Sequence, residues 1–232
     1  PLVLCQNGWG NAEIFAARSI ALACAVATDM ATATGNADYR ARAAFLTPIA
    51  KAYGTDIGCE VAQLGIQIHG GMGYVEETGA AQFLRDVRIT AIYEGTNGIQ
   101  AMDLVGRKLA DGGDAAFRLI EDIQRSAEAA RARLPDLAGD LWLAGEALRE
   151  VTEALVAQPL NDRFAGAVPY LRGFARVLGG QAHLKAALAD PARLPLARVM
   201  IRRLLPDYLS LFAAVREGSA GLYALTQDDL AA

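Results

Sequence analysis

The sequence predicts an all-α protein made of an up-and-down helical bundle followed by a second helical bundle. Apolar residues recur at steps of three and four along most of the 232 residues, which is the spacing of a buried helix face. The one run with strand-like alternation, residues 87–93, has no second run with which to pair. Because a single strand forms no sheet, we expect residues 87–93 to be an irregular or extended connector.

Composition places the chain among globular proteins and argues against two classes of partner. Hydrophobic residues make up 53% of the chain and charged residues 21%, a balance typical of a folded protein. A net charge of −4 gives no electrostatic reason to expect nucleic acid. The best apolar stretch, residues 19–28, lies between Arg18 and Asp29 and is shorter than the roughly 20 residues of a membrane span, so we expect no span.

The cysteines and histidines indicate neither a metal site nor disulfide bonds. Cys5, Cys24 and Cys59 lie far apart in the sequence without any C-x-x-C spacing, so we do not expect them to form a dedicated zinc cluster with the two histidines. We therefore expect a reducing, cytoplasmic compartment. The chain begins with Pro1 and shows no signal-peptide pattern, so we expect it to be a piece of a longer protein.

Two long helices are predicted in the first half of the chain. The first covers residues 11–33, with Asn11 as its N-cap and Gly35 at its end. Its apolar stripe is Phe15, Leu22, Val26 and Met30. The stripe of the second helix must be buried along about six turns and consists of Leu46, Ile49, Tyr53, Ile57, Val61, Leu64 and Ile68. Gly54 and Gly58 in this helix would allow a neighbouring helix to approach closely.

The helical period then fails over residues 69–79, where four glycines in eleven residues predict a loop. It resumes over residues 80–85. After the connector at residues 87–93, Thr96 or Asn97 caps a helix that is predicted to run to about Leu109.

Residues 111–114, Asp-Gly-Gly-Asp, form the clearest linker and divide the chain into domains at 1–110 and 111–232. The second domain shows four amphipathic patterns, enough to close one bundle. Pro135 is predicted to stop the first of these helices. Pro206 is predicted to bend the fourth near residues 202–205 because it removes a hydrogen bond.

Two features between residues 67 and 100 are not explained by packing. The glycine-rich end of the second helix either terminates the helix or exposes backbone N–H groups to an anion, with the Gln67 amide beside them. Glu94 stands just before a helix, where a carboxylate is ordinarily solvated. Folded into an apolar cleft, the same carboxylate would serve as a general base. The residues alone leave both alternatives open.

These residues resemble the C-terminal motifs of the acyl-CoA dehydrogenases. The similarity is strongest over residues 67–109. It combines Gln-Ile-His-Gly-Gly-Met-Gly-Tyr, then Arg-Asp, then Ile-Tyr-Glu-Gly-Thr-Asn-Gly-Ile-Gln, in the order that the family uses. It extends more loosely through the two preceding helices. The residues after 111 are similar to the extra helical domain of some bacterial members.

The resemblance implies that Glu94 is the catalytic base of an α,β-dehydrogenation. The base removes the proton α to a thioester while a hydride leaves the β carbon for flavin N5, and the product is a trans-2-enoyl-CoA. The Glu94 N–H would help to polarise the thioester carbonyl. Gly95 matches a backbone position that lines the substrate site, and Tyr93 either lines the acyl pocket or anchors the connector.

The resemblance implies FAD as the cofactor, through two segments. In the family, the first contacts the adenosine and pyrophosphate part of an FAD that is typically held mainly by a neighbouring subunit. It corresponds here to Gln67, Ile68, His69, Gly70 and Gly71. The second segment is Thr96, Asn97 and Gly98. Many members have glutamine in place of Gly98, so only a backbone contact is expected there.

Five residues are expected to have structural roles. His69 is expected to act through packing or its backbone, and His183 to be a surface or packed residue. Arg85 and Asp86 resemble a salt-bridging pair, and Cys59 is expected to be a small buried thiol.

The partners implied are an acyl-CoA substrate, an electron-transferring flavoprotein and further copies of the chain in a homodimer or homotetramer, in fatty acid β-oxidation. An acyl-CoA oxidase and a non-catalytic helical scaffold are the alternatives. Short, branched, long and sulfur-containing acyl groups, including methylthiopropanoyl, all remain open. The family's N-terminal helical domain and middle β domain are absent from these residues, so we expect the isolated chain to bind FAD weakly or not at all and to be inactive.

Overall fold

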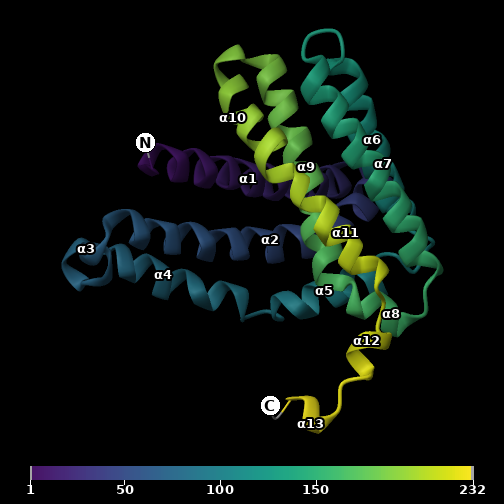
Figure 1. Ribbon diagram of the computed structural model, residues 1–232. Coiled ribbons are helices and arrows are strands. Elements are labelled where there is room, and N and C mark those ends of the chain that lie inside the picture. The colour runs from purple at the N-terminus through teal and green to yellow at the C-terminus, as the bar shows by residue number, and fades with distance from the viewer. Residues whose placement is uncertain (1, 231–232) are drawn as a thin grey trace.

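The computed structural model describes the backbone of residues 2–230 and the side chains of residues 8–229. Within that part of the chain every regular element is a helix, and the all-α prediction is confirmed. Figure 1 shows two groups of helices. One is elongated and the other is stacked across one end of it. Pro1 and the Cys5 side chain lie outside the described residues.

The elongated group is formed by the first half of the chain. Its main helices are α1 (Leu2–Thr34), α2 (Ala37–His69), α3 (Gly71–Tyr74), α4 (Ala80–Arg88) and α5 (Asn97–Gly106). Two short 3-10 turns join them, at Glu76–Thr78 and Ile89–Ala91. Helix α1 runs beside α2, and α4 returns along α2 from the tip at α3 (Figure 1).

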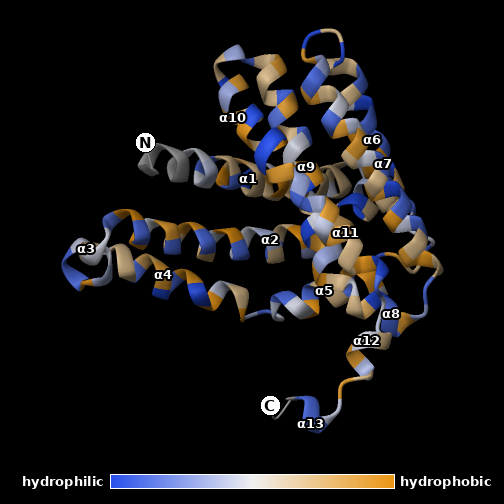
Figure 2. Ribbon diagram, viewed as in Figure 1, coloured by the Kyte–Doolittle hydropathy of each residue, from blue (hydrophilic) through white to orange (hydrophobic). Residues whose placement is uncertain are grey.

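The stacked group is formed by the second half. Its main helices are α6 (Asp114–Ala130), α7 (Pro135–Ala157), α9 (Ala167–Ala189), α10 (Leu194–Val199) and α11 (Tyr208–Arg216). Short helices add α8 (Leu160–Ala165), α12 (Ala220–Tyr223) and α13 (Gln227–Leu230). Helices α12 and α13 extend away from the body, and α13 is mostly hydrophilic (Figure 2).

Helix α1 begins before the predicted start and buries a different face. Asn11 lies inside the helix rather than at its N-cap, because the helix continues through Gly8 and Gly10. The buried face carries Ala12, Ala16 and Ile20, whereas Leu22 is 63% exposed. Small side chains let α2 and α9 pack closely against α1, and this closeness selects the alanine face over the larger apolar stripe.

By length and composition, one described helix, Gly8–Thr34, is apolar enough to cross a membrane, with a mean hydropathy of 1.5 over its best window. Such a test is weak evidence because core helices of proteins without a membrane contact also pass it. Arg18 and Asp29 lie within the helix. The absence of a span therefore stays an expectation.

Helix α2 follows the predicted stripe most closely in its first half. Phe45, Leu46, Ile49, Tyr53 and Ile57 are buried, while the stripe beyond them is half-buried. The Asn36 side chain caps the helix by accepting a 2.7 Å hydrogen bond from the Asp38 N–H.

The close approach predicted at two glycines of α2 occurs at one of them. A Cβ on Gly58 would lie 2.9 Å from Val87 Cγ2 of α4, whereas one on Gly54 would meet nothing within 4 Å.

Two predictions in the middle of the chain are wrong. Residues 87–93 are not extended, because α4 continues to Arg88 and a 3-10 turn follows at Ile89–Ala91. Packing of α4 along α2 favours the helix over the strand-like alternation of side chains. Residues 69–79 include the short helix α3 and a 3-10 turn rather than a loop alone.

The second half matches its predicted pattern with two adjustments. Helix α6 ends at Ala130, and Pro135 begins α7 instead of stopping α6. The predicted bend at Pro206 is present: the helix becomes a π-helix over Met200–Leu204 and a 3-10 turn over Leu205–Asp207. Gln158 and Pro159 separate α7 from α8.

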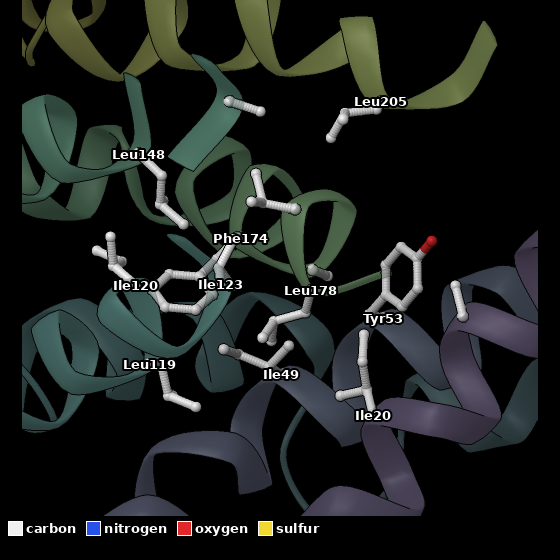
Figure 3. Close-up of a cluster of buried hydrophobic side chains, with 14 of the residues drawn as sticks. Ile20, Ile49, Tyr53, Leu119, Ile120, Ile123, Leu148, Phe174, Leu178 and Leu205 are labelled. Atoms are coloured by element: carbon white, nitrogen blue, oxygen red, sulfur yellow. The ribbon is translucent and has the colours of Figure 1, made fainter. Parts of the chain in front are cut away.

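One hydrophobic core connects the two groups of helices. Figure 3 shows Ile20 of α1 and Ile49 of α2 in the same cluster as Phe174 and Leu178 of α9. Helix α9 is central to it and contacts α1, α2, α5, α6, α7, α10 and α11. The division at residue 110 stays a prediction, although Gly112 and Gly113 do form a left-handed turn there, with φ of 85° and 84°.

Candidate active site

The loop before α5 has an unusual backbone at Glu94. Among the described residues Glu94 is the one non-glycine with positive φ, at 53°, and Gly95 follows with φ of 83°. A side chain in this region costs on the order of 1–3 kcal/mol, so the surrounding contacts must hold it there. Such strain is concentrated at functional sites, which makes Glu94 a candidate on structural grounds.

Hydrogen bonds hold the backbone on both sides of Glu94. The Lys51 ammonium of α2 donates to the Gly95 carbonyl and to Asn97 Oδ1, each at 2.8 Å. The Gln100 amide of α5 donates to the Glu94 carbonyl at 3.1 Å. The Thr96 hydroxyl caps α5 by accepting from the Ile99 N–H at 3.4 Å, as predicted.

Asn97 anchors the start of α5 to the middle of α2. Its side-chain amide donates to Thr55 Oγ1 at 2.9 Å, to Asp56 Oδ1 at 2.6 Å and to the Ala52 carbonyl at 3.2 Å. Lys51, Thr55 and Asp56 were not predicted as site residues, because they lie about 40 residues before the loop. The only signal available was that Lys51 and Thr55 are polar and one helical turn apart.

The Glu94 side chain is exposed and opens on a groove of about 520 Å³. Within the described part of the chain no hydrogen bond reaches its carboxylate. Most of the groove wall is apolar, and its charged members besides Glu94, which are Asp103 and Arg107, pair with each other. The groove is lined by Glu94, Gly95, Ile99, Gln100, Met102, Asp103, Gly106, Arg107, Leu160 and Phe164.

The glycine-rich segment lies at the other end of α2. Gln67, His69, Gly70 and Gly71 are exposed and Ile68 is half-buried, while His69 Nδ1 lies 2.8 Å from the Gly65 carbonyl. Thr55 and His69 stand fourteen residues apart, which at 1.5 Å per residue places the two predicted FAD segments about 21 Å apart. The fold therefore brings Thr96, Asn97 and Gly98 together with Glu94, and leaves residues 67–71 distant from it.

The described residues fit the pyrophosphate of a dinucleotide such as FAD better than they fit its flat ring system. Gly70 and Gly71 have open space around them, and the Gln67 side chain beside them is exposed, so the segment can present donors to a pyrophosphate. The groove at Glu94 is open, and its described walls do not enclose a flat aromatic ring. Gly98 has room for a side chain, since an added Cβ would meet only Thr96 Oγ1, at 3.9 Å.

A second groove, of about 590 Å³, lies between α1, α2 and α4. It is lined mainly by apolar and small residues, together with Arg18 and His69. It is larger than the groove at Glu94 but has no carboxylate. Its polar side chains include the imidazole of His69, whereas the groove at Glu94 holds a carboxylate that has no hydrogen-bond partner among the described residues.

The remaining predicted residues have structural surroundings. Arg85 pairs with Glu76 at 2.9 Å rather than with Asp86, because the turn at Glu76–Thr78 brings that carboxylate over α4. His183 is buried and packs against Phe15, with ring centroids 4.6 Å apart. Cys59 is half-buried, and Tyr93 is exposed. Among the described residues no group of three metal-ligating side chains is close enough to hold an ion.

Two family models match this chain over most of its length. "Acyl-CoA dehydrogenase, C-terminal domain" covers residues 10–110, and "Acetyl-CoA dehydrogenase C-terminal like" covers residues 119–226. The chain belongs to the acyl-CoA dehydrogenase family. The first match includes both the Glu94 loop and the glycine-rich segment, and the second covers nearly all of the stacked helices.

The alignments to individual relatives show what fraction of each relative's length this chain covers. The 3-methylmercaptopropionyl-CoA dehydrogenase of Ruegeria pomeroyi is 42% identical over 165 residues, which are 68% of this chain and 28% of that protein. The caffeyl-CoA reductase-Etf complex subunit CarC of Acetobacterium woodii is 41% identical over 61 residues, 26% of this chain and 16% of that protein. The chain thus spans less than a third of either relative.

A solved structure shares the fold. The ACDH-11 protein of Caenorhabditis elegans, solved in complex with C11-CoA, superposes with a TM-score of 0.68. The match covers 80% of this chain and 33% of that one at 18% identity. At this level of identity the acyl-CoA dehydrogenase fold is what the two share.

Proposed function

We propose that the full-length protein is an FAD-dependent acyl-CoA dehydrogenase in which Glu94 is the catalytic base. The observation that carries the proposal is the backbone at Glu94. A strained, positive-φ glutamate is held by Lys51 and Gln100 while its carboxylate stays unpaired above a groove. A glutamate with no chemical role gains nothing from that conformation.

Glu94 would act by taking the proton α to the thioester carbonyl. The loop contributes a rigid position for the carboxylate, because the carbonyls of Glu94 and Gly95 are both hydrogen-bonded to neighbouring helices. The Glu94 N–H would donate to the thioester carbonyl and so acidify the α carbon. Bound FAD would supply the two-electron acceptor for the hydride that leaves the β carbon.

The cofactor would be held by two segments of this chain. Gln67, Ile68, His69, Gly70 and Gly71 would contact the adenosine and pyrophosphate part, and Thr96, Asn97 and Gly98 a second part. The distance of about 21 Å between the segments along α2 is consistent with contacts to FAD molecules of two subunits. We therefore include a homodimer or homotetramer in the proposal.

The electron acceptor proposed is an electron-transferring flavoprotein, and the compartment proposed is cytoplasmic. The name of the Acetobacterium woodii relative includes an Etf complex, which supports the first point. Acyl-chain length remains open. The name of the Ruegeria pomeroyi relative adds support for including sulfur-containing acyl groups.

Replacement of Glu94 by glutamine in the full-length protein tests the proposal. We expect kcat for acyl-CoA oxidation to fall by at least about 10²-fold, the smaller end of general-base contributions, with the FAD content unchanged. Glu76→Gln is the matched control. Glu76 is an exposed glutamate between the two sequence motifs, but it does not line the groove. Equal activity of Glu94→Gln and wild type would mean a helical scaffold. Oxygen consumption without the flavoprotein would mean an oxidase.

A further inference from the structure

The groove at Glu94 has a wall from the second half of the chain. Leu160 and Phe164 of α8 face Met102 and Gly106 of α5 across it. An added Cβ on Gly106 would lie 3.1 Å from Phe164 Cε1 and 3.8 Å from Leu160 Cδ1. Gly106 therefore lets α8 approach α5 closely, and the two helices together form the groove.

Helix α8 is fixed in this position from both ends. Arg163 donates to the carbonyls of Gln158, at 3.0 Å, and of Val156. Asp162 accepts hydrogen bonds from Ser219, including one of 2.8 Å from its N–H. These contacts tie the six-residue helix to the end of α7 and to the segment after α11, so its two apolar side chains form a stable wall.

The groove suits an uncharged, flexible chain. Its apolar surface comes from Ile99, Met102, Leu160 and Phe164, and its one arginine is neutralised by Asp103. A nucleotide phosphate would find no free positive charge in it. An acyl tail would call for an enclosed cavity, whereas Ile99 and Leu160 are 54% and 52% exposed.

We propose that Leu160 and Phe164 bind the thiol-side arm of the acyl-CoA thioester, so that the second helical region takes part in substrate binding. This inference rests on the proposed function, because the reacting carbon must lie at Glu94. From there the groove follows α5, whose ten residues span about 15 Å. The arm carries amides, and Gln100, whose side-chain N–H donates to the Glu94 carbonyl, keeps its side-chain carbonyl oxygen as an acceptor for one of them.

The test is Leu160→Asp in the full-length enzyme, with Leu143→Asp as the matched control. Both leucines are exposed, at 52% and 62%, but Leu143 lies on α7 outside the groove. We expect Leu160→Asp to raise KM for an acyl-CoA about tenfold with kcat within twofold, since it replaces an apolar contact by a charge. Leu143→Asp should leave both constants unchanged. Equal effects of the two variants would overturn the proposal.

Truncated substrates identify the part of the thioester that is bound. With an N-acetylcysteamine thioester, which lacks most of the arm, we expect Leu160→Asp and wild type to have the same kcat/KM. A defect that persists with this substrate and grows with acyl-chain length would place the acyl group in the groove and overturn the proposal.

Binding measurements separate this proposal from the proposed function. Calorimetric titration of a 2-enoyl-CoA into the Glu94→Gln enzyme reports binding without turnover. Weaker binding after adding Leu160→Asp supports the arm site whether or not Glu94 is the base. Unchanged binding would overturn the arm site even if Glu94→Gln had abolished activity.

Discussion

Glu13 of α1 and Arg176 of α9 form a buried ion pair that joins the two groups of helices. Each residue is 3% exposed, and the Tyr53 hydroxyl of α2 donates to the second Glu13 carboxylate oxygen at 2.6 Å. Burial raises the pKa of the Tyr53 phenol far above its usual range, so Tyr53 stays a donor. Arg176 also reaches Asp207 at 3.4 Å, while its Nε atom is buried without a partner.

Arg176→Met should therefore destabilise the protein strongly. The substitution leaves the Glu13 carboxylate buried without its cation, and we expect the free energy of unfolding to fall by about 3–5 kcal/mol. Urea denaturation followed by circular dichroism measures the change. The double variant Glu13→Gln/Arg176→Met removes both charges and should recover part of the loss. A loss below about 1 kcal/mol in the single variant would show that the pair contributes little.

Gly73, at the tip formed by α3, should not tolerate replacement by alanine. A Cβ there would lie 2.2 Å from the Ile66 carbonyl oxygen and 2.9 Å from His69 Cβ, so the backbone would have to move. We expect Gly73→Ala to lower the free energy of unfolding by about 1–3 kcal/mol. Gly71→Ala is the control, since its Cβ meets nothing within 4 Å and should change stability by less than about 0.5 kcal/mol.

The sequence predicted the parts of the fold that repeat along a helix. The α2 stripe from Leu46 to Ile57 and the bend at Pro206 were readable because each follows from local spacing or from a missing N–H. The buried face of α1 was not predictable from the sequence in this way. Leu22 and Val26 are the larger apolar residues, but packing against α2 and α9 selects the alanine face, and that choice depends on partners far along the chain.

The candidate site was predictable as a set of motifs and not as a geometry. The cap of α5 could be narrowed to Thr96 or Asn97 from position alone, and the structure has Thr96 there. The positive φ of Glu94 could not be predicted, because glutamate has no preference for it and the contacts that impose it come from Lys51 and Gln100. Phe164 could not be placed beside Gly106 from spacing, since 58 residues separate them.

Lys51→Met should lower activity by displacing the loop. The ammonium is a donor to the Gly95 carbonyl and to Asn97 Oδ1, and methionine replaces the unbranched chain of lysine up to Cε without either hydrogen bond. We expect kcat of the full-length enzyme to fall by up to about 10²-fold, because small misplacements of a catalytic group have effects of this size. Lys108→Met is the control, since Lys108 pairs with Asp103 at 3.7 Å and does not touch the loop. Equal activity of the two variants would contradict a positioning role for Lys51.

His183 should make stability depend on pH. It lies buried under α1, with Nε2 3.0 Å from the Ala12 carbonyl. Burial lowers the pKa of His183 from the usual 6.5, and the Arg193 charge acts in the same direction, while the hydrogen bond to Ala12 and the Glu13 charge oppose the shift without cancelling it. Because the folded state holds the ring neutral, the unfolded state binds the proton first as the pH falls. Stability is then fully present above pH 6.5 and declines between 6.5 and the lower pKa of the folded state, by at most about 1.4 kcal/mol per pH unit. His183→Gln keeps a donor near Nε2 but does not titrate, so its unfolding free energy, measured by urea denaturation from pH 7.5 to 5, should lack this decline. Parallel pH profiles for the two proteins would assign the decline to other groups.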